Sequence, residues 1–214
     1  MNVIFLSTIG AVILLDKYAL GEFGVSQPLV AGAIIGALFG DTQMGIFLGA
    51  MLQLVFLGGL PIGRDIPPDG QVAGITCCGA YFLLRTANPS GHALLVAILF
   101  ALVGAVIGGT LDIFTRHYNN KFYRMFQKNK SQLSMYHLLG LVTAFARGFC
   151  IFLPFFALSS IIRVPDVVPH MSRHILLIIC LSMGLANAVY LFIKKSTAVY
   201  VIIGGLCGLL LVVL

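Results

Sequence analysis

The stretch GRDIPPDGQ, residues 63–71, places three charges and a proline pair inside a chain of 214 residues that is 59% hydrophobic and only 9% charged. Typical soluble domains are about 25% charged. A chain of this length could not hide so much apolar surface from water, whereas a bilayer accommodates it. The composition therefore predicts an all-α, polytopic transmembrane helical protein, and it raises the question of what the charged break does there.

The apolar stretches around this break are short and are interrupted by Gly, Pro and Asp. They cover residues 2–20, 29–40, 44–60 and 72–84. At about 1.5 Å per residue, 29–40 falls well short of a hydrocarbon core of ~30 Å. Irregular backbone at membrane depth survives only where it lines a cavity. The pattern thus favours broken or re-entrant helices that line a transport site.

Longer apolar stretches follow at 93–115, 138–162 and 174–193, and residues 197–214 are apolar to the last residue. We expect one membrane domain, 1–214, in which 1–91 is a broken-helix core carrying the substrate site and 92–214 supplies longer transmembrane spans. Residues 1–15 lack a basic start and a small-residue cleavage pattern, which favours an uncleaved first span.

The distribution of basic residues predicts the orientation. A loop at 115–132 contains five Lys and Arg residues and no acid, so the positive-inside rule places it in the cytoplasm. Lys194 and Lys195 fall on the same side, two long spans later. The loop 163–173 is then external, although it also carries two arginines. This bias accounts for the net charge of +6 without nucleic acid.

Few residues form patterns typical of catalysis or metal binding. The cysteines lie in apolar stretches without CxxC or Cys/His spacing, so we expect packed thiols. The histidines sit at span edges and loops, where an interfacial position is expected, and no phosphate-binding loop is present. We therefore expect neither a metal nor a cofactor, and a permease rather than an enzyme. The cysteines are Cys77, Cys78, Cys150, Cys180 and Cys207, and the histidines are His92, His117, His137, His170 and His174.

Two polar residues before the break are candidates for the site. Asp41 follows glycines four residues apart that would permit tight helix crossing. A carboxylate beside a short apolar helix is costly and is usually functional or paired, although a turn residue at the membrane surface is the alternative. Gln53 lies within an apolar helix, where its amide either bonds a neighbouring helix or binds a hydroxyl-rich ligand.

The break itself supplies the remaining candidates. Two consecutive prolines forbid helix continuation, so Asp65 to Asp69 should be extended and Asp69 should cap a helix that begins near Gly70 or Gln71. An ordinary capped loop is the alternative to a substrate loop between half-helices. Carboxylates and amides suit sugar hydroxyls. We therefore add Asp65, Asp69, Gln71 and Thr76 to the candidate substrate-binding residues, with Asn187 as a weaker one.

The segment QPLVAGAIIGALFGDTQMGIFLGAMLQLVFLGGLPIGRDIPPDGQVAGI, residues 27–75, resembles the enzyme IIC component of the mannose/fructose/sorbose class of the bacterial phosphotransferase system. Weaker similarity continues through YHLLGLVTAFARGFCIFLP, residues 136–154. Gln27 stands where the family usually has Arg, and Gln53 stands where some members have Glu. The matching motifs are Gln27-Pro28-Leu29, Gly40-Asp41, Gln53 and Pro67-Pro68-Asp69.

This resemblance implies a sugar permease subunit in the bacterial inner membrane. It would pair with an enzyme IID membrane subunit in a hetero-oligomer, and cytoplasmic IIA and IIB proteins would carry the phosphoryl group to the emerging sugar. The family is thought to transport by an elevator-like movement of a core, and its members usually continue beyond this C-terminus. Two other readings stay open: a stand-alone transporter without phosphoryl coupling, and a truncated membrane scaffold that does not transport.

Overall fold

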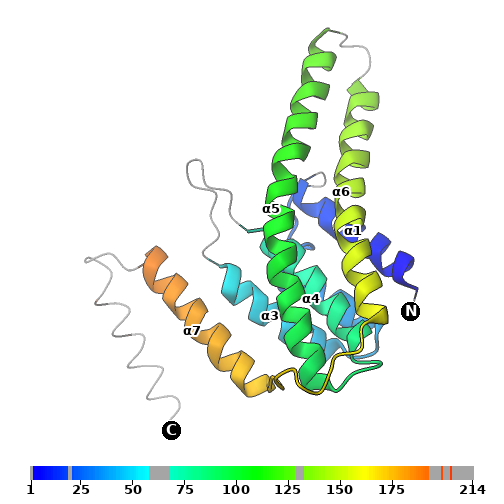
Figure 1. The fold of residues 1–214 in the computed structure, drawn as a ribbon. Coiled ribbons are helices and arrows are strands. Elements are labelled where there is room, and N and C mark those ends of the chain that lie inside the picture. The colour runs from blue at the N-terminus through cyan, green and yellow to red at the C-terminus, as the bar shows by residue number, and fades with distance from the viewer. Residues whose placement is uncertain are drawn as a thin grey trace.

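The computed structural model describes residues 2–18, 21–57, 68–128 and 133–192, together with positions 199 and 203. Within these ranges the chain forms seven helices and no strand (Figure 1). The all-α prediction is therefore confirmed. The helices are α1 (Val3–Tyr18), α2 (Pro28–Leu38), α3 (Thr42–Phe56), α4 (Gly70–Leu84), α5 (Ser90–Lys128), α6 (Leu133–Ile161) and α7 (Arg173–Phe192).

The first four helices begin and end where the sequence breaks them. Pro28 occupies the first turn of α2, where its missing N–H costs no intrahelical bond. The Asp69 carboxylate accepts hydrogen bonds from the backbone N–H groups of Gln71 and Val72, each at 3.2 Å. This confirms the predicted cap and the helix start at Gly70. Asp65 and Pro67 lie outside the described residues.

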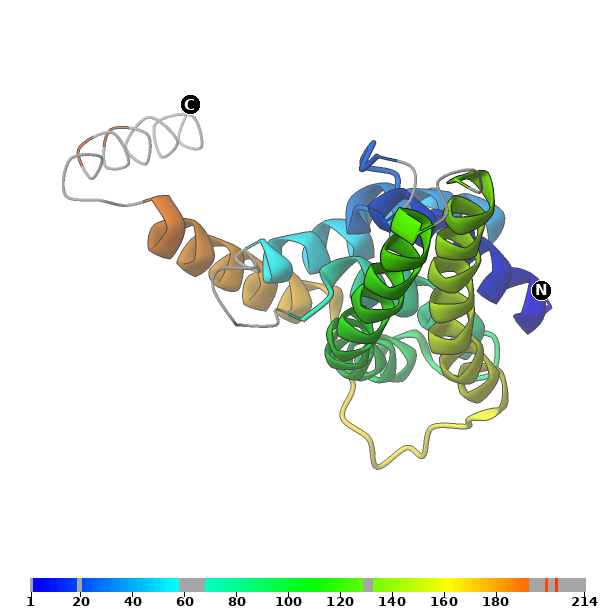
Figure 2. The same ribbon diagram turned by 90° about the horizontal axis from the view of Figure 1, so that it is seen from above.

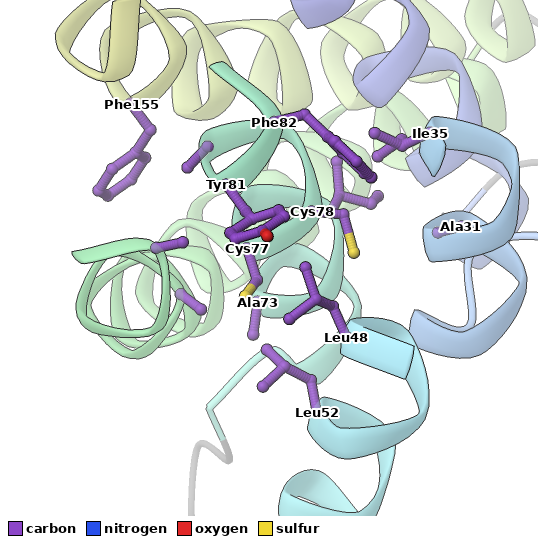
Figure 3. Close-up of a cluster of buried hydrophobic side chains, with 14 of the residues drawn as sticks. Ala31, Ile35, Leu48, Leu52, Ala73, Cys77, Cys78, Tyr81, Phe82 and Phe155 are labelled. Atoms are coloured by element: carbon purple, nitrogen blue, oxygen red, sulfur yellow. The ribbon is translucent and has the colours of Figure 1, made fainter. Parts of the chain in front are cut away.

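The short helix α4 forms the centre of the molecule. Every residue from Val72 to Leu84 is buried, because this helix is apolar around its whole circumference. It contacts α1, α2, α3, α5 and α6. Figure 3 shows Cys78 and Phe82 facing Ile35 of α2 and Leu48 of α3. The body of α4 is therefore held at the interior of the bundle.

Helices α2 and α3 form a close antiparallel hairpin through glycines. A Cβ added at Gly36 would lie 2.9 Å from the Cα of Gly45, and one at Gly32 would collide with the Gly45 carbonyl oxygen. The predicted packing role of these glycines is therefore confirmed. At the turn between the helices, Gly40 has a φ of +75°, a conformation that glycine adopts without strain.

Within the described ranges, three helices are long and apolar enough to cross a membrane: Ser90–Gln127, Ser134–Ile161 and Arg173–Tyr190. The expected loop at 115–132 is wrong for residues 115–128, which continue α5 as helix to a total of 39 residues. No Gly or Pro interrupts these residues, so nothing stops the helix. Its length of about 58 Å exceeds the ~30 Å hydrocarbon core, and Figure 1 shows the α5–α6 hairpin rising past the other helices.

The remaining long helix, α7, lies at the edge of the bundle. It packs against α3, and Figure 2 shows it extending away from α1 and α6. The Asn187 side chain donates to the backbone oxygen of Val55 at 3.0 Å, and Gly184 faces Leu54. Asn187 therefore joins α7 to the C-terminal end of α3.

Candidate substrate site at the start of α4

The Asp69 carboxylate lies at the meeting point of four helices. Its residue is only 3% exposed. One oxygen lies 3.0 Å from Nζ of Lys17 on α1, and the other lies 2.9 Å from a guanidinium nitrogen of Arg147 on α6. The Asp69 N–H donates to the Ala105 carbonyl oxygen on α5 at 2.8 Å. The N-terminal end of α4 is thus bonded to α1, α5 and α6.

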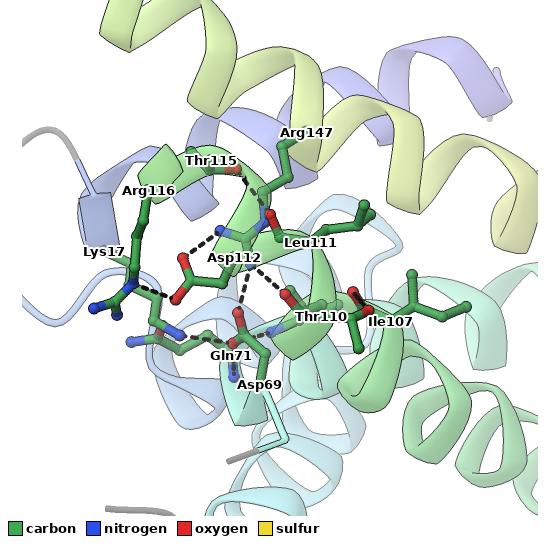
Figure 4. A network of polar contacts seen from close by, with 12 residues as sticks. Lys17, Asp69, Gln71, Ile107, Thr110, Leu111, Asp112, Thr115, Arg116 and Arg147 are labelled. Atoms are coloured by element: carbon green, nitrogen blue, oxygen red, sulfur yellow. Dashed lines mark hydrogen bonds and ion pairs between the residues drawn. The ribbon is translucent and has the colours of Figure 1, made fainter. Parts of the chain in front are cut away.

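Arg147 links Asp69 to a second carboxylate. Its side chain is 4% exposed, and it donates to the Gly108 carbonyl oxygen at 2.8 Å and to Asp112 at 3.4 Å. Asp112 in turn accepts from the largely exposed Arg116 at 2.8 Å. Figure 4 shows these groups converging beneath α6. We call Lys17, Asp69, Asp112 and Arg147 the Asp69 cluster; its two cations and two carboxylates balance.

The sequence interpretation did not place Lys17, Asp112 or Arg147 in the site. Arg147 lies within residues 136–154, the stretch of weaker family similarity. A signal was nevertheless present, since an arginine in the middle of a long apolar helix usually faces the protein interior and pairs with an acid. Which acid it meets depends on helices far apart in sequence, and only the fold supplies that.

The Asp16 carboxylate, which is not part of the Asp69 cluster, orders the connection between α1 and α2. Asp16 is buried and accepts hydrogen bonds from the backbone N–H groups of Phe23, Gly24 and Ser26 at 2.8 to 3.1 Å, and from the Ser26 hydroxyl at 3.2 Å. These bonds fold residues 23–26 back against the end of α1. Pro28 thereby lies over Gly74 of α4, where a Cβ would approach it to 2.7 Å.

Gln53 lies near the same end of the molecule. Its side-chain oxygen accepts a hydrogen bond from the Leu29 N–H at 3.1 Å. The Gln27 side chain makes no cap bond to α2, so Gln53 satisfies one of the free N–H groups at this helix start. The bond to a neighbouring helix, one of the two roles expected for Gln53, is therefore present.

Gln71 and Thr76 differ from the carboxylates in their hydrogen bonding. Among the residues that the structure describes, Gln71 Oε1 and Thr76 Oγ1 are buried and have no hydrogen-bond partner. Positions 71 and 76 are five residues apart on α4, so their side chains leave the helix axis in directions that differ by about 140°. Thr76 faces Gly104 of α5, where a Cβ would lie 3.2 Å from its hydroxyl oxygen. The two groups therefore belong to one helix but not to one face.

Asp41 lies at the other end of α4. Its carboxylate caps α3 by accepting from the Met44 N–H at 3.0 Å and pairs with Arg85 at 2.6 Å. This hydrogen bond from Arg85 lowers the pKa of Asp41. Arg85 directly follows α4, whereas Asp69 precedes it. The 15 residues of α4 rise about 22 Å, so the expected convergence of Asp41 with Asp69 is wrong in this fold.

The fold thus brings Asp69 and Gln71 together and places Gln53 nearby, since Phe56 at the end of α3 contacts Gly70. Among the described parts of the chain, no group of three His, Cys, Asp or Glu side chains gathers as a metal site would require. Cys77, Cys78 and Cys180 are buried, but Cys150 is exposed. His92, in the first turn of α5, is buried, and its ring centre lies 5.7 Å from that of His170.

Comparison with known sequences identifies the family. The family model described as "PTS system sorbose-specific iic component" matches residues 1–212. The sorbose-specific EIIC component of Klebsiella pneumoniae is 33% identical over 97 residues, which is 45% of this chain and 34% of that protein. The mannose-specific EIIC component of Escherichia coli K12 is 31% identical over 88 residues, 41% of this chain and 32% of that protein.

The fructose permease IIC component of Bacillus subtilis 168 is 34% identical over 98 residues, 45% of this chain and 34% of that protein. The matched segment therefore spans about a third of the length of these curated relatives. Their names assign sorbose, mannose and fructose to those proteins.

Solved structures share the fold. A protein described only as a membrane protein superimposes with a TM-score of 0.68 at 22% identity, covering 96% of this chain and 84% of the other. A cryo-EM structure of the mannose transporter ManYZ with microcin E492 gives a TM-score of 0.56 at 20% identity, covering 99% of this chain and 93% of the matched one. With the family model matching nearly the whole sequence, the chain belongs to the family of sorbose-specific IIC components of the phosphotransferase system, which also includes the mannose and fructose IIC proteins.

Proposed function

We propose that this chain is the sugar permease subunit, enzyme IIC, of a mannose-class phosphotransferase system in the bacterial inner membrane. It binds a hexose-type sugar and translocates it for phosphorylation by partner subunits. The observation that carries the proposal is the start of α4, where buried charges and amides hold a broken helix inside an apolar bundle. Ionisable groups in such a position usually mark a substrate path.

The sugar site is proposed to form at this end of α4. Asp69, Gln71 and Gln53 supply the polar groups, Asp65 on the preceding segment adds a further acceptor, and Thr76 extends the site toward α5. The Asp69 oxygens are engaged by four donors, so Gln71 Oε1 is the acceptor with spare capacity. Asp41 is proposed as a polar group at the opposite entrance to the core rather than as part of the same site.

The partners follow from this assignment. We propose pairing with an enzyme IID membrane subunit, and phosphoryl transfer by cytoplasmic IIA and IIB proteins rather than by this chain. Residues 1–91 form the broken-helix core that moves in an elevator-like manner, and 92–214 form the longer spans. Three of those spans are helices of membrane-crossing length and composition, which supports a multi-pass arrangement.

The decisive experiment measures binding and uptake over a sugar panel. The chain is expressed in a bacterial strain without endogenous hexose permeases, alone and with IID, IIA and IIB proteins. Phosphorylated sugar should accumulate only when all four are present. Accumulation of unphosphorylated sugar by the chain alone would favour a stand-alone transporter. Failure of the purified chain to bind any sugar, with or without IID, would favour a non-transporting scaffold.

Replacing Gln71 by Met tests the site itself. The change keeps the length of the side chain and removes an amide whose oxygen has no partner in the described structure, so folding should be unaffected. Loss of one ligand hydrogen bond should raise the sugar Kd about two- to tenfold, since a bond of this kind contributes roughly 0.5–1.5 kcal/mol. Gln43→Met, at an exposed position of α3, is the matched control. Equal affinities for both variants would remove Gln71 from the site.

A further inference from the structure

The start of α4 is fixed by polar contacts from every side. Lys17 holds it to α1, the Ala105 carbonyl oxygen holds it to α5, and Arg147 holds it to α6, at 2.8 to 3.0 Å. The helix body beyond is packed by apolar side chains. The hydrogen bonds in these ion pairs join specific atoms in a preferred direction, whereas apolar burial is non-directional. These polar contacts therefore define where the first turn of α4 lies.

Stability alone does not account for this cluster. A buried ion pair gains little over well-packed apolar residues of the same volume, because desolvation of the charges offsets their attraction. The neighbouring α5 backbone is also shaped around it: a Cβ at Gly108 would lie 2.9 Å from the Cβ of Asp69, and the Gly108 oxygen is bonded by Arg147 at 2.8 Å. Charges kept at such a cost inside a membrane bundle usually serve function.

The cluster acts directly on Gln71. The same Asp69 oxygen that meets Lys17 also accepts the Gln71 N–H. The position of the Gln71 backbone therefore depends on where the two cations hold the Asp69 carboxylate. Asp112 fixes the other side of the Arg147 guanidinium at 3.4 Å, which restricts its rotation.

We infer that Lys17 and Arg147 are positioning residues for sugar binding: by clamping Asp69 from α1 and α6, they hold the first turn of α4, and Gln71 with it, in the binding geometry. This inference rests on the proposed sugar site at that turn. Neither cation needs to touch the sugar. Their removal should therefore raise the Kd for every sugar of the panel by the same factor. Removal of a residue that contacts the sugar directly would instead change the order of sugar affinities.

The test uses Arg147→Lys, which keeps the charge but loses the forked geometry, and the double variant Arg147→Met with Asp112→Asn. The double variant leaves Lys17 paired with Asp69. Arg116 loses Asp112 as its partner, but its side chain is 70% exposed, so no uncompensated charge is buried and the protein should fold. Arg124→Gln, at an exposed position of α5, is the control.

Two quantities are measured on full-length protein in detergent or lipid. One is the Kd for each sugar of the panel. The other is the maleimide reaction rate of the native Cys77 and Cys78, both fully buried on α4, in a background with Cys150, Cys180 and Cys207 replaced by Ala. This rate reports the position of α4 without any sugar.

For the double variant we expect both the reaction rate and the sugar Kd to rise about tenfold, the change that corresponds to about 1.4 kcal/mol. Arg147→Lys should give a smaller rise, and Arg124→Gln none. A raised Kd with an unchanged reaction rate, or a changed order of sugars, would show direct contact and overturn the inference. A raised rate with unchanged Kd, or no change in either, would also overturn it.

A different experimental result would show that the proposed function itself is wrong. If the wild-type chain binds no sugar with or without IID, the proposed function fails and the role in sugar binding fails with it. The reaction rates of Cys77 and Cys78 in the Arg147 variants then still decide whether Arg147 holds α4 in place.

Discussion

At the scale of single residues, the absence of a side chain at Gly45 determines how α2 and α3 pack. A Cβ at this position would collide with the Gly32 carbonyl oxygen and lie 2.8 Å from the Cα of Gly36. These neighbours are backbone atoms, which cannot rotate away as a side chain would. The hairpin that brings Gln53 to the start of α2 therefore requires glycine, rather than alanine, at individual positions.

Gly45→Ala should consequently destabilise the protein. Separating α2 from α3 to admit one methyl group should cost about 1–3 kcal/mol, the usual range for overpacking, and thermal unfolding in detergent would measure it. Gly140→Ala is the control, because a Cβ there would meet Asn119 at an ordinary 3.7 Å and Ala favours helix by about 1 kcal/mol over Gly. Equal midpoints for the two variants would contradict the packing argument.

At the scale of elements, the start of α3 combines a helix cap with an ion pair. The Asp41 carboxylate accepts from the Met44 N–H and pairs with Arg85, whose guanidinium also lies 4.8 Å from the centre of the Phe82 ring. The pair is about one-third exposed on each side, so solvent weakens its contribution. The helix cap should therefore stabilise α3 more than the ion pair does, because α3 is short and its first N–H groups need an acceptor.

Two substitutions at Asp41 separate the stabilising contribution of the helix cap from that of the ion pair. Asn keeps the cap but not the charge, so Asp41→Asn should cost less than about 1 kcal/mol, while Asp41→Ala should cost about 1 kcal/mol more. Because Arg85 lowers the pKa of Asp41 from its usual 3.8, the contribution of the charge is present above pH 3.8 and is lost as the pH falls through the lowered folded-state pKa. Unfolding midpoints measured between neutral and acidic pH should converge for wild type and Asp41→Asn; an Asp41→Asn deficit that persists in acid would contradict the pairing.

At the scale of the whole molecule, the two ends of α4 face opposite sides of the bundle. The Asp69 cluster lies beside α5 and α6. The other end of α4, where Arg85 pairs with Asp41, is joined to the connection 162–172 by Asn88, whose amide bonds the Leu84 and Ile162 carbonyl oxygens and the Val164 N–H. The basic residues of 116–128 predict a cytoplasmic position for the α5–α6 hairpin. With this orientation, the proposed sugar site would lie at the end of α4 on the cytoplasmic side, where phosphorylation would occur.

Reporter fusions test this orientation. Alkaline phosphatase fused after Val167, which is 93% exposed, should be active because it is exported, and a fusion after Lys128 should be inactive. Green fluorescent protein at the same positions should give the reverse pattern. An active phosphatase fusion after Lys128 would invert the assignment and move the Asp69 cluster to the outer side.

The sequence by itself determined the class and the local breaks. Apolar composition predicts membrane helices, Pro28 and the Pro67–Asp69 break predict helix starts, and the Asp69 cap is a bond between residues three apart or fewer. Such features depend on neighbours along the chain, so pattern and propensity suffice for them. The motifs of residues 27–75 likewise identified the family that the matching model confirms.

Only the tertiary structure decided which polar groups meet. Asp69 pairs with Lys17 and Arg147, 52 positions before it and 78 after it in the sequence, and it lies a full helix length from Asp41. Short-range patterns carry no information on such pairings, because these depend on the direction in which buried helices cross. Here α1 and α6 approach closely at Gly148, where a Cβ would lie 3.1 Å from the Ala11 Cα, and α4 is buried between them and the other helices from Val72 to Leu84.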